Sequence, residues 1–135
     1  MGQQQLLLII LGVIVVGIAV AVGITMFADN AVSANKDAVT NDLVNLASRA
    51  QQFYRRPLAL GGGQGSFAGL TADAAGLAKL TSKASNANGT YNILTAGDQT
   101  SVELEGFGTE KGTDQQPLHV TMLVYADSTQ VAFHN

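Results

Sequence analysis

The feature that most constrains this chain is an unbroken apolar run over residues 6–28. The run carries no charged residue, and only three glycines and one threonine interrupt it. At about 1.5 Å per residue, a helix over this run is about 34 Å long, enough to cross a bilayer core of about 30 Å. Its apolar residues cover every side of such a helix, whereas a single packing seam needs only one stripe. We therefore expect the run to lie in lipid or at the centre of a many-helix assembly.

The flanks of the run do not fit a secretory signal peptide. Gln3, Gln4 and Gln5 stand where a signal peptide has basic residues, and the run is longer than the usual apolar core of about 7–15 residues. All seven basic residues follow the run, so the positive-inside rule taken alone would place the rest of the chain in the cytoplasm.

The composition excludes several classes of function. The chain has no cysteine, so disulfides and thiolate metal sites are excluded. Its net charge is -3 and it has no basic patch, so we predict no nucleic-acid partner. No nucleophile, paired-carboxylate or phosphate-loop pattern is present, and His119 and His134 are predicted to be exposed residues and not metal ligands. We predict no enzyme activity, no catalytic residue, no metal and no cofactor.

The apolar run continues into an amphipathic segment without a break. No proline or glycine occurs from Met26 to Arg56, early acidic and late basic residues suit a helix, and Pro57 ends it. The sequence predicts one helix from about Gln4 to Arg56. Its second half carries an apolar stripe with helical spacing, formed by Val32, Val39, Leu43, Leu46, Ala50 and Phe53.

The remainder predicts a glycine-rich loop and then a sheet. Thr71 or Asp73 is positioned to cap a short helix that carries Leu77 and Leu80. Four apolar or alternating runs separated by turn residues predict an antiparallel meander, which the stripe would cover; these runs are residues 90–94, 101–107, 118–125 and 130–134. The predicted class is α+β. Its segments are the apolar helix 1–28, its amphipathic continuation 29–56, the loop region 57–89 and the sheet 90–135.

Two short motifs have alternative interpretations. Asn88-Gly89-Thr90 matches an N-glycosylation acceptor, but it is also a hairpin turn signal before a strand, and we favour the turn. Residues 63–68 match a loose form of the dinucleotide fingerprint, but they follow a helix end and not a strand, so we dismiss it. The glycines there are expected to let the loop lie against a neighbouring subunit.

This layout resembles the type IV pilins and the related pseudopilins of type II secretion. The resemblance rests on the charge-free N-terminal segment of a long helix, the glycine-bearing loop and the sheet. The string ASRAQQFYRRP before that loop resembles the helix end of the pseudopilins. Such proteins lose a short basic leader after a glycine and are methylated at the new N-terminus. The resemblance thus implies that Met1 is the mature N-terminus, unless cleavage falls after Gly2.

The resemblance also implies a function. We expect a structural subunit of an extracellular pilus-like filament, which waits in the inner membrane and polymerises with itself with the help of pilus assembly machinery. The apolar core of the filament would include Leu6, Leu7, Ile10, Val13, Ile14, Gly17, Val20 and Ile24. The alternatives are a pseudopilin, a single-pass anchored binding module and a membrane-anchored enzyme.

Two positions depart from the pattern of the family. Pilins usually have a glutamate at position five, which pairs with the N-terminal amine of a neighbouring subunit. This chain has Gln5, which can accept a hydrogen bond but supplies no charge. The proline found mid-segment in many pilins, where the helix often unwinds in the fibre, is missing. We expect any melting to centre near Gly17, because glycine and the β-branched residues around it lower helix propensity. The glycines could equally serve close helix packing.

Overall fold

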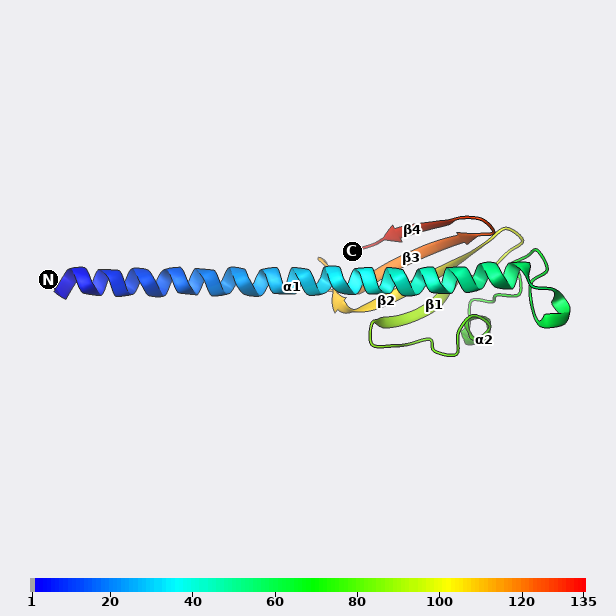
Figure 1. Ribbon diagram of the computed structural model, residues 1–135, viewed down its shortest axis with the longest axis horizontal. Helices are drawn as coiled ribbons and strands as arrows, with labels where there is room; N and C mark the ends of the chain where they lie inside the picture. The colour runs from blue at the N-terminus through cyan, green and yellow to red at the C-terminus, as the bar shows by residue number, and fades with distance from the viewer. Residues whose placement is uncertain (1) are drawn as a thin grey trace.

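A computed structural model describes residues 2–135, and it is dominated by one helix. Helix α1, Gly2–Arg55, is a continuous rod of 54 residues whose first half projects away from the rest of the chain (Figure 1). It is followed by a short 3-10 turn, η1 (Leu58–Leu60), and by a short helix, α2 (Ala74–Ala78). Four strands complete the fold. They are β1 (Gly89–Thr95), β2 (Ser101–Lys111), β3 (Pro117–Tyr125) and β4 (Thr129–Phe133).

This arrangement confirms the predicted α+β fold with a long apolar N-terminal helix. The helix starts two residues before the predicted Gln4 and ends one residue before Arg56. It is unbroken through Gly17 in the single chain, whereas the melting hypothesis concerns the assembled fibre and stays a prediction. The hypothesis that Met1 is the mature N-terminus concerns a residue outside the described ones.

The sheet is an antiparallel meander with the order β1-β2-β3-β4. Its register sets Leu104 of β2 beside Ile93 of β1 and Met122 of β3. Strict alternation along β2 turns Val102 and Leu104 inward and leaves glutamates on the other face. The short connections between strands enforce this order, because antiparallel neighbours need only tight turns.

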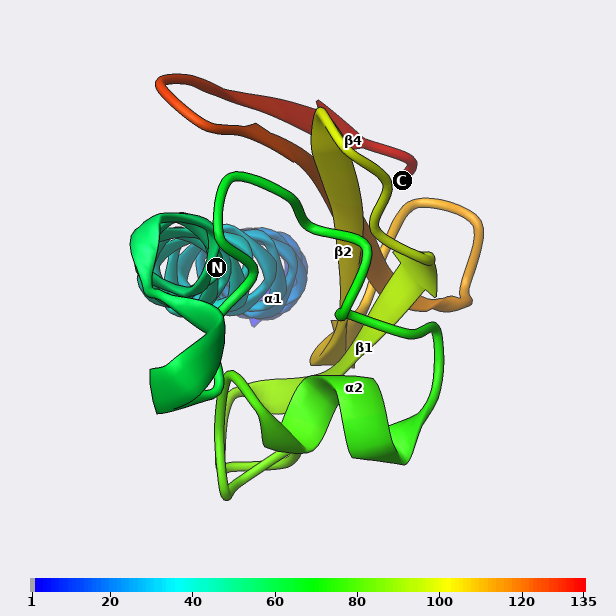
Figure 2. The same ribbon diagram turned by 90° about the vertical axis from the view of Figure 1, so that its right-hand side faces the viewer.

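The second half of α1 packs on one face of the sheet, which leaves the other face uncovered by the helix (Figure 2). Five residues of the predicted stripe are buried in the core, and Val32 at its front edge is half-buried. The five are Val39, Leu43, Leu46, Ala50 and Phe53. The helix comes close at Gly106, where an added Cβ would lie 2.9 Å from Cγ1 of Val39. A small residue in β2 therefore sets the distance between the layers.

The glycine-rich loop closes the end of α1. The backbone N–H of Gly63 donates to the carbonyl of Phe53 at 2.7 Å, and that of Gly65 donates to the carbonyl of Tyr54 at 2.7 Å. A Cβ on Gly63 would lie only 1.9 Å from the carbonyl oxygen of Ser66. The loop thus satisfies carbonyls that a helix end leaves without partners, and a side chain at Gly63 would block it.

A polar cluster fixes the start of β1 to α1. The Oδ2 atom of Asp42 accepts hydrogen bonds from the Tyr91 hydroxyl at 2.5 Å, from Asn86 at 2.9 Å and from Asn88 at 3.0 Å. Burial opposes the ionisation of Asp42, but these three bonds together hold its pKa below the ordinary value. Burial and the Asp42 carboxylate raise the pKa of Tyr91. The cluster therefore contains a carboxylate and a neutral phenol at ordinary pH.

The short helix α2 has one of the two N-cap residues that the sequence predicts. The Asp73 carboxylate accepts from the N–H of Gly76 at 2.8 Å, and the Thr71 hydroxyl donates to the same carboxylate at 2.6 Å. Asp73 is thus the N-cap and Thr71 supports it. The predicted short helix carries Leu77, whereas Leu80 lies in the turn that follows α2, and both leucines are buried in the core.

Candidate assembly surface

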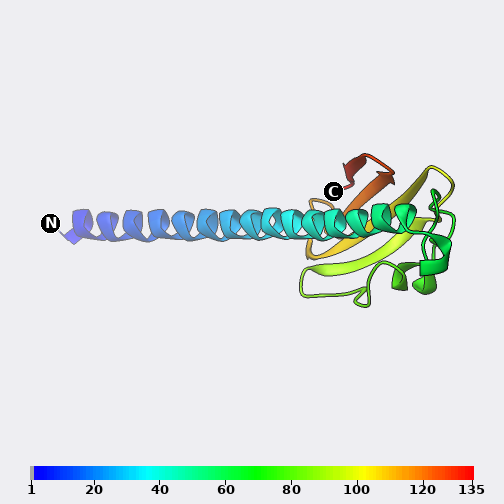
Figure 3. The ribbon, with the colours of Figure 1, turned by 45° about the vertical axis from the view of Figure 1, so that its right-hand side comes forward.

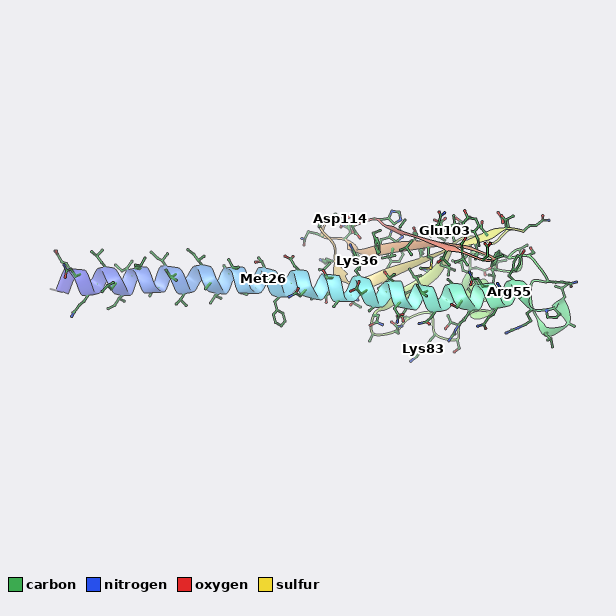
Figure 4. All side chains as sticks on the ribbon, turned by 45° about the horizontal axis from the view of Figure 1, so that its top comes forward. Met26, Lys36, Arg55, Lys83, Glu103 and Asp114 are labelled. Carbon is green, nitrogen blue, oxygen red and sulfur yellow. The ribbon has the colours of Figure 1, made fainter. Side chains whose placement is uncertain are left out.

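The first half of α1 is the largest apolar surface of the described chain. Every residue from 2 to 30 is exposed, and the segment extends freely beyond the head formed by residues 31–135 (Figure 3). Among the predicted core positions, the leucines, isoleucines and valines have exposed fractions between 53% and 68%. These residues are Leu6, Leu7, Ile10, Val13, Ile14, Val20 and Ile24, and Gly17 is exposed among them. Side chains project from all sides of the rod (Figure 4).

The apolar segment carries almost no polar group that needs a partner from outside. The Thr25 hydroxyl donates to the carbonyl of Val22 within the same helix at 2.8 Å, and the helix pairs the backbone. Gln5 is exposed near the free end, where a second molecule has access to it. A segment with its polar groups satisfied internally is suited to lipid or to a bundle of similar helices.

The end of the apolar segment coincides with the start of the head. Phe27 is 81% exposed, and Asp29 is the first charged residue of the chain. Val32 packs against the core cluster three residues later, and Lys36 lies over the Phe133 ring of β4 at 5.1 Å from its centroid. None of the buried residues of the core cluster belongs to the apolar segment, so the segment is free to bind elsewhere.

Within residues 2–135, α1 is the one helix that by length and composition alone is apolar enough to cross a membrane. None of its most apolar window is buried inside the chain, in contrast to the core helix of a soluble protein. The segment is therefore compatible with membrane anchoring.

The two histidines lie on the outer face of the sheet, where they form an aromatic stack. His119 stacks on Phe107 with 4.5 Å between ring centroids and on His134 with 4.6 Å. Its Nε2 lies 3.2 Å from the Glu105 carboxylate, and His134 pairs with the Thr121 hydroxyl. His134 is exposed as predicted, but His119 is half-buried because two rings cover it. No three histidine, aspartate or glutamate side chains within residues 2–135 are grouped to hold a metal ion.

Asn88 lies in a turn directly before β1. Its side-chain nitrogen donates to Asp42, and its carbonyl accepts from Asn35 at 2.8 Å. A sugar on this nitrogen would have to compete with the bond to Asp42. N-glycosylation stays a prediction.

The loose dinucleotide pattern at residues 63–68 lies on the end of α1. The backbone N–H groups of Gly63 and Gly65 donate to the helix carbonyls, so they are not free for a phosphate group. The glycines contact their own helix, and their predicted contact with a neighbouring subunit stays a prediction.

The sequence analysis did not predict a role for two exposed leucines. Leu58 and Leu60 lie in the η1 turn beyond the end of α1 and are exposed. The signal was available, because apolar residues between a helix-ending proline and a glycine run have no partner nearby in the chain.

Comparisons of the chain with protein-family models, with curated proteins and with solved structures found no match.

Proposed function

We propose that this chain is a structural subunit of an extracellular, type IV pilus-like helical filament. The observation that carries the proposal is the exposure of the apolar segment, residues 6–28, on the same rigid helix that supports the head. Burial of one large aliphatic side chain contributes about 1.5–3 kcal/mol, so this segment cannot stay in water. It needs lipid or other copies of itself.

The transfer of this segment from lipid into a helix bundle changes its hydrophobic free energy little, because both surroundings are apolar. The direction of assembly is then set by packing between helices, by contacts between heads and by assembly machinery. In this view lipid holds the subunit before assembly, and the filament holds it afterwards.

The shape of the chain favours an open assembly over a closed one. Its apolar rod and its head lie at opposite ends of one axis (Figure 1). Copies displaced along this axis would join unlike surfaces, and such contacts build filaments when no rotation closes the ring. The apolar segments would gather along the axis, and the heads would form the outer shell.

The experiment is to shear fibres from cells that produce this chain and to identify their subunit by mass spectrometry and electron microscopy. We expect long fibres that consist mainly of this chain. A pseudopilin would give no long fibres at native expression levels. An anchored binding module would remain in the membrane fraction and give monomers in detergent, and either result would contradict the proposal.

A further inference from the structure

Two exposed leucines form an apolar knob at the far end of the head. Leu58 and Leu60 are 67% and 68% exposed, and they lie in η1, just beyond the end of α1 (Figures 1 and 3). This end is opposite to the apolar segment. We call Leu58 and Leu60 the distal knob.

The distal knob is held in a fixed conformation. The N–H of Leu60 donates to the carbonyl of Pro57 at 3.0 Å, and the N–H of Gly61 donates to that of Leu58 at 2.9 Å. Gly61 has a φ of 76°, a left-handed conformation that favours glycine. Because the turn is already ordered, its docking would cost little conformational entropy.

A pocket lies at the other end of the head, where α1 enters it. Its volume is about 440 Å³, within the range of common binding pockets. One wall comes from α1 and the other from the connection between β2 and β3. The lining residues are Ala28, Asp29, Val32, Ser33, Lys111, Gly112, Thr113 and Gln115. We call this the basal pocket.

The charges beside the two features are complementary. Arg56 precedes the distal knob, and Asp29 lines the α1 wall of the basal pocket. The one contact between a basic side chain and a carboxylate joins His119 and Glu105, so Arg56 and Asp29 have no charged partner among residues 2–135. The basic residue of the pocket, Lys111, belongs to the other wall and leaves the α1 wall acidic.

We infer that the distal knob of one copy docks in the basal pocket of the next copy along the filament, with Arg56 paired to Asp29. The inference rests on the proposed function and identifies one contact of that assembly. The occupant is a second copy because knob and pocket lie at opposite ends of one rigid head and cannot meet within one chain. A contact between unlike ends also repeats without closing.

The contact fixes the displacement between the two copies. About 26 helical residues separate the α1 wall of the pocket from the end of α1, which is about 40 Å at 1.5 Å per residue. The same displacement sets residues 2–28 of the upper copy beside residues 29–55 of the lower copy. The apolar segment would therefore lie along the neighbour's helix while the heads stack.

The absence of native cysteines makes a disulfide test specific. Leu60→Cys and Thr113→Cys are combined in one chain, and sheared filaments are oxidised with copper phenanthroline. Within one chain the two positions lie at opposite ends of the head, too far apart for a disulfide. We expect a ladder of cross-linked multimers on a non-reducing gel. Each single variant should give at most dimers.

A matched control replaces the pocket position by one on the side of the head. Lys83 lies away from both ends (Figure 4), so Leu60→Cys with Lys83→Cys should give no ladder. Filaments of the test variant that yield no ladder, or the same ladder in the control, would overturn the docking contact and leave the proposed function standing. A wild-type chain that forms no filament would overturn both.

The ion pair has its own test in the same cysteine background. Arg56→Glu should lower the yield of ladder about threefold, as expected for a surface pair. Asp29→Lys alone should lower it similarly, and the two changes together should restore it. A double variant that is as weak as the single ones would contradict the pairing of these two residues.

Discussion

The two halves of α1 share one continuous backbone but differ in where their apolar side chains find an apolar environment. In residues 29–55 most of the large apolar residues form one stripe, and five of its six members are buried in the core of the same chain. In residues 2–28 they cover the whole circumference, and none is buried. The comparison teaches that burial within one chain requires only one face of a helix. A helix that is apolar on every face requires surroundings from outside its chain.

The largest expected effect comes from the same substitution in the two halves. Leu43 is 0% exposed, so Leu43→Ala should destabilise the head by about 2–5 kcal/mol through lost burial and the cavity it leaves. Leu11 is 57% exposed, and Leu11→Ala should leave the stability of the head unchanged. Urea unfolding of the full chain in mild detergent measures both. All three tyrosines lie in the head, so their fluorescence reports its unfolding alone. Equal losses in the two variants would break the comparison.

An introduced charge should have a large effect in the apolar segment and a small effect at an exposed position of the head. Val13→Lys should cost about 2.5–3.5 kcal/mol in membrane insertion and should eliminate filaments, without an effect on the unfolding of the head. Leu94 in β1 is also exposed, and Leu94→Lys should change the stability of the head by less than about 0.5 kcal/mol. Membrane fractionation and fibre yield measure the first effect. Filaments at wild-type yield from Val13→Lys would contradict a core position for this segment.

A smaller effect tests how the head is fixed to the helix. Tyr91→Phe keeps the ring but removes the 2.5 Å bond to Asp42, which retains two other donors. We expect a loss of about 1 kcal/mol, since the carboxylate is only partly buried. A double-mutant cycle with Asp42→Ala, which removes the acceptor, measures the coupling. Strictly additive losses would show that the bond contributes nothing.

The smallest effect is a dependence on pH. The folded-state pKa of Asp42 is lowered, so its contribution is present above the unfolded pKa of about 4 and is lost as the pH falls through the folded-state value. Asp42→Asn should therefore lose less stability than the wild type between pH 5 and pH 2.5. Urea midpoints across this range measure the difference. Parallel curves would indicate that other carboxylates carry all of the acid sensitivity.

Much of the fold could be predicted because its signals are local. Pro57 ends the helix, and the spacing from Val39 to Phe53 identifies the buried face. Turn residues bound β1, β3 and β4 within one residue of their true ends, whereas β2 runs four residues beyond its predicted end at residue 107. The contacts that join distant parts of the chain could not be predicted. Neither the Asp42 cluster nor the closure of α1 by Gly63 follows any repeating pattern.

The candidate site could likewise be predicted only in part. The apolar segment was evident because its composition alone identifies it. The basal pocket was not, since it brings Val32 of α1 beside Thr113 of the distant β2–β3 connection, and only the folded chain shows them together. His119 differed from its predicted exposure for the same reason, because its cover comes from Phe107 of β2 and from His134, the residue directly after β4.

The most direct test of the central claim is a helical reconstruction of native fibres at side-chain resolution. We expect residues 6–24 of every copy to lie at the lowest radius, packed against the helices of other copies, with the heads outside. Density that instead shows these segments at the surface of the fibre, or subunits that stay singly in membrane and never form fibres, would contradict the account.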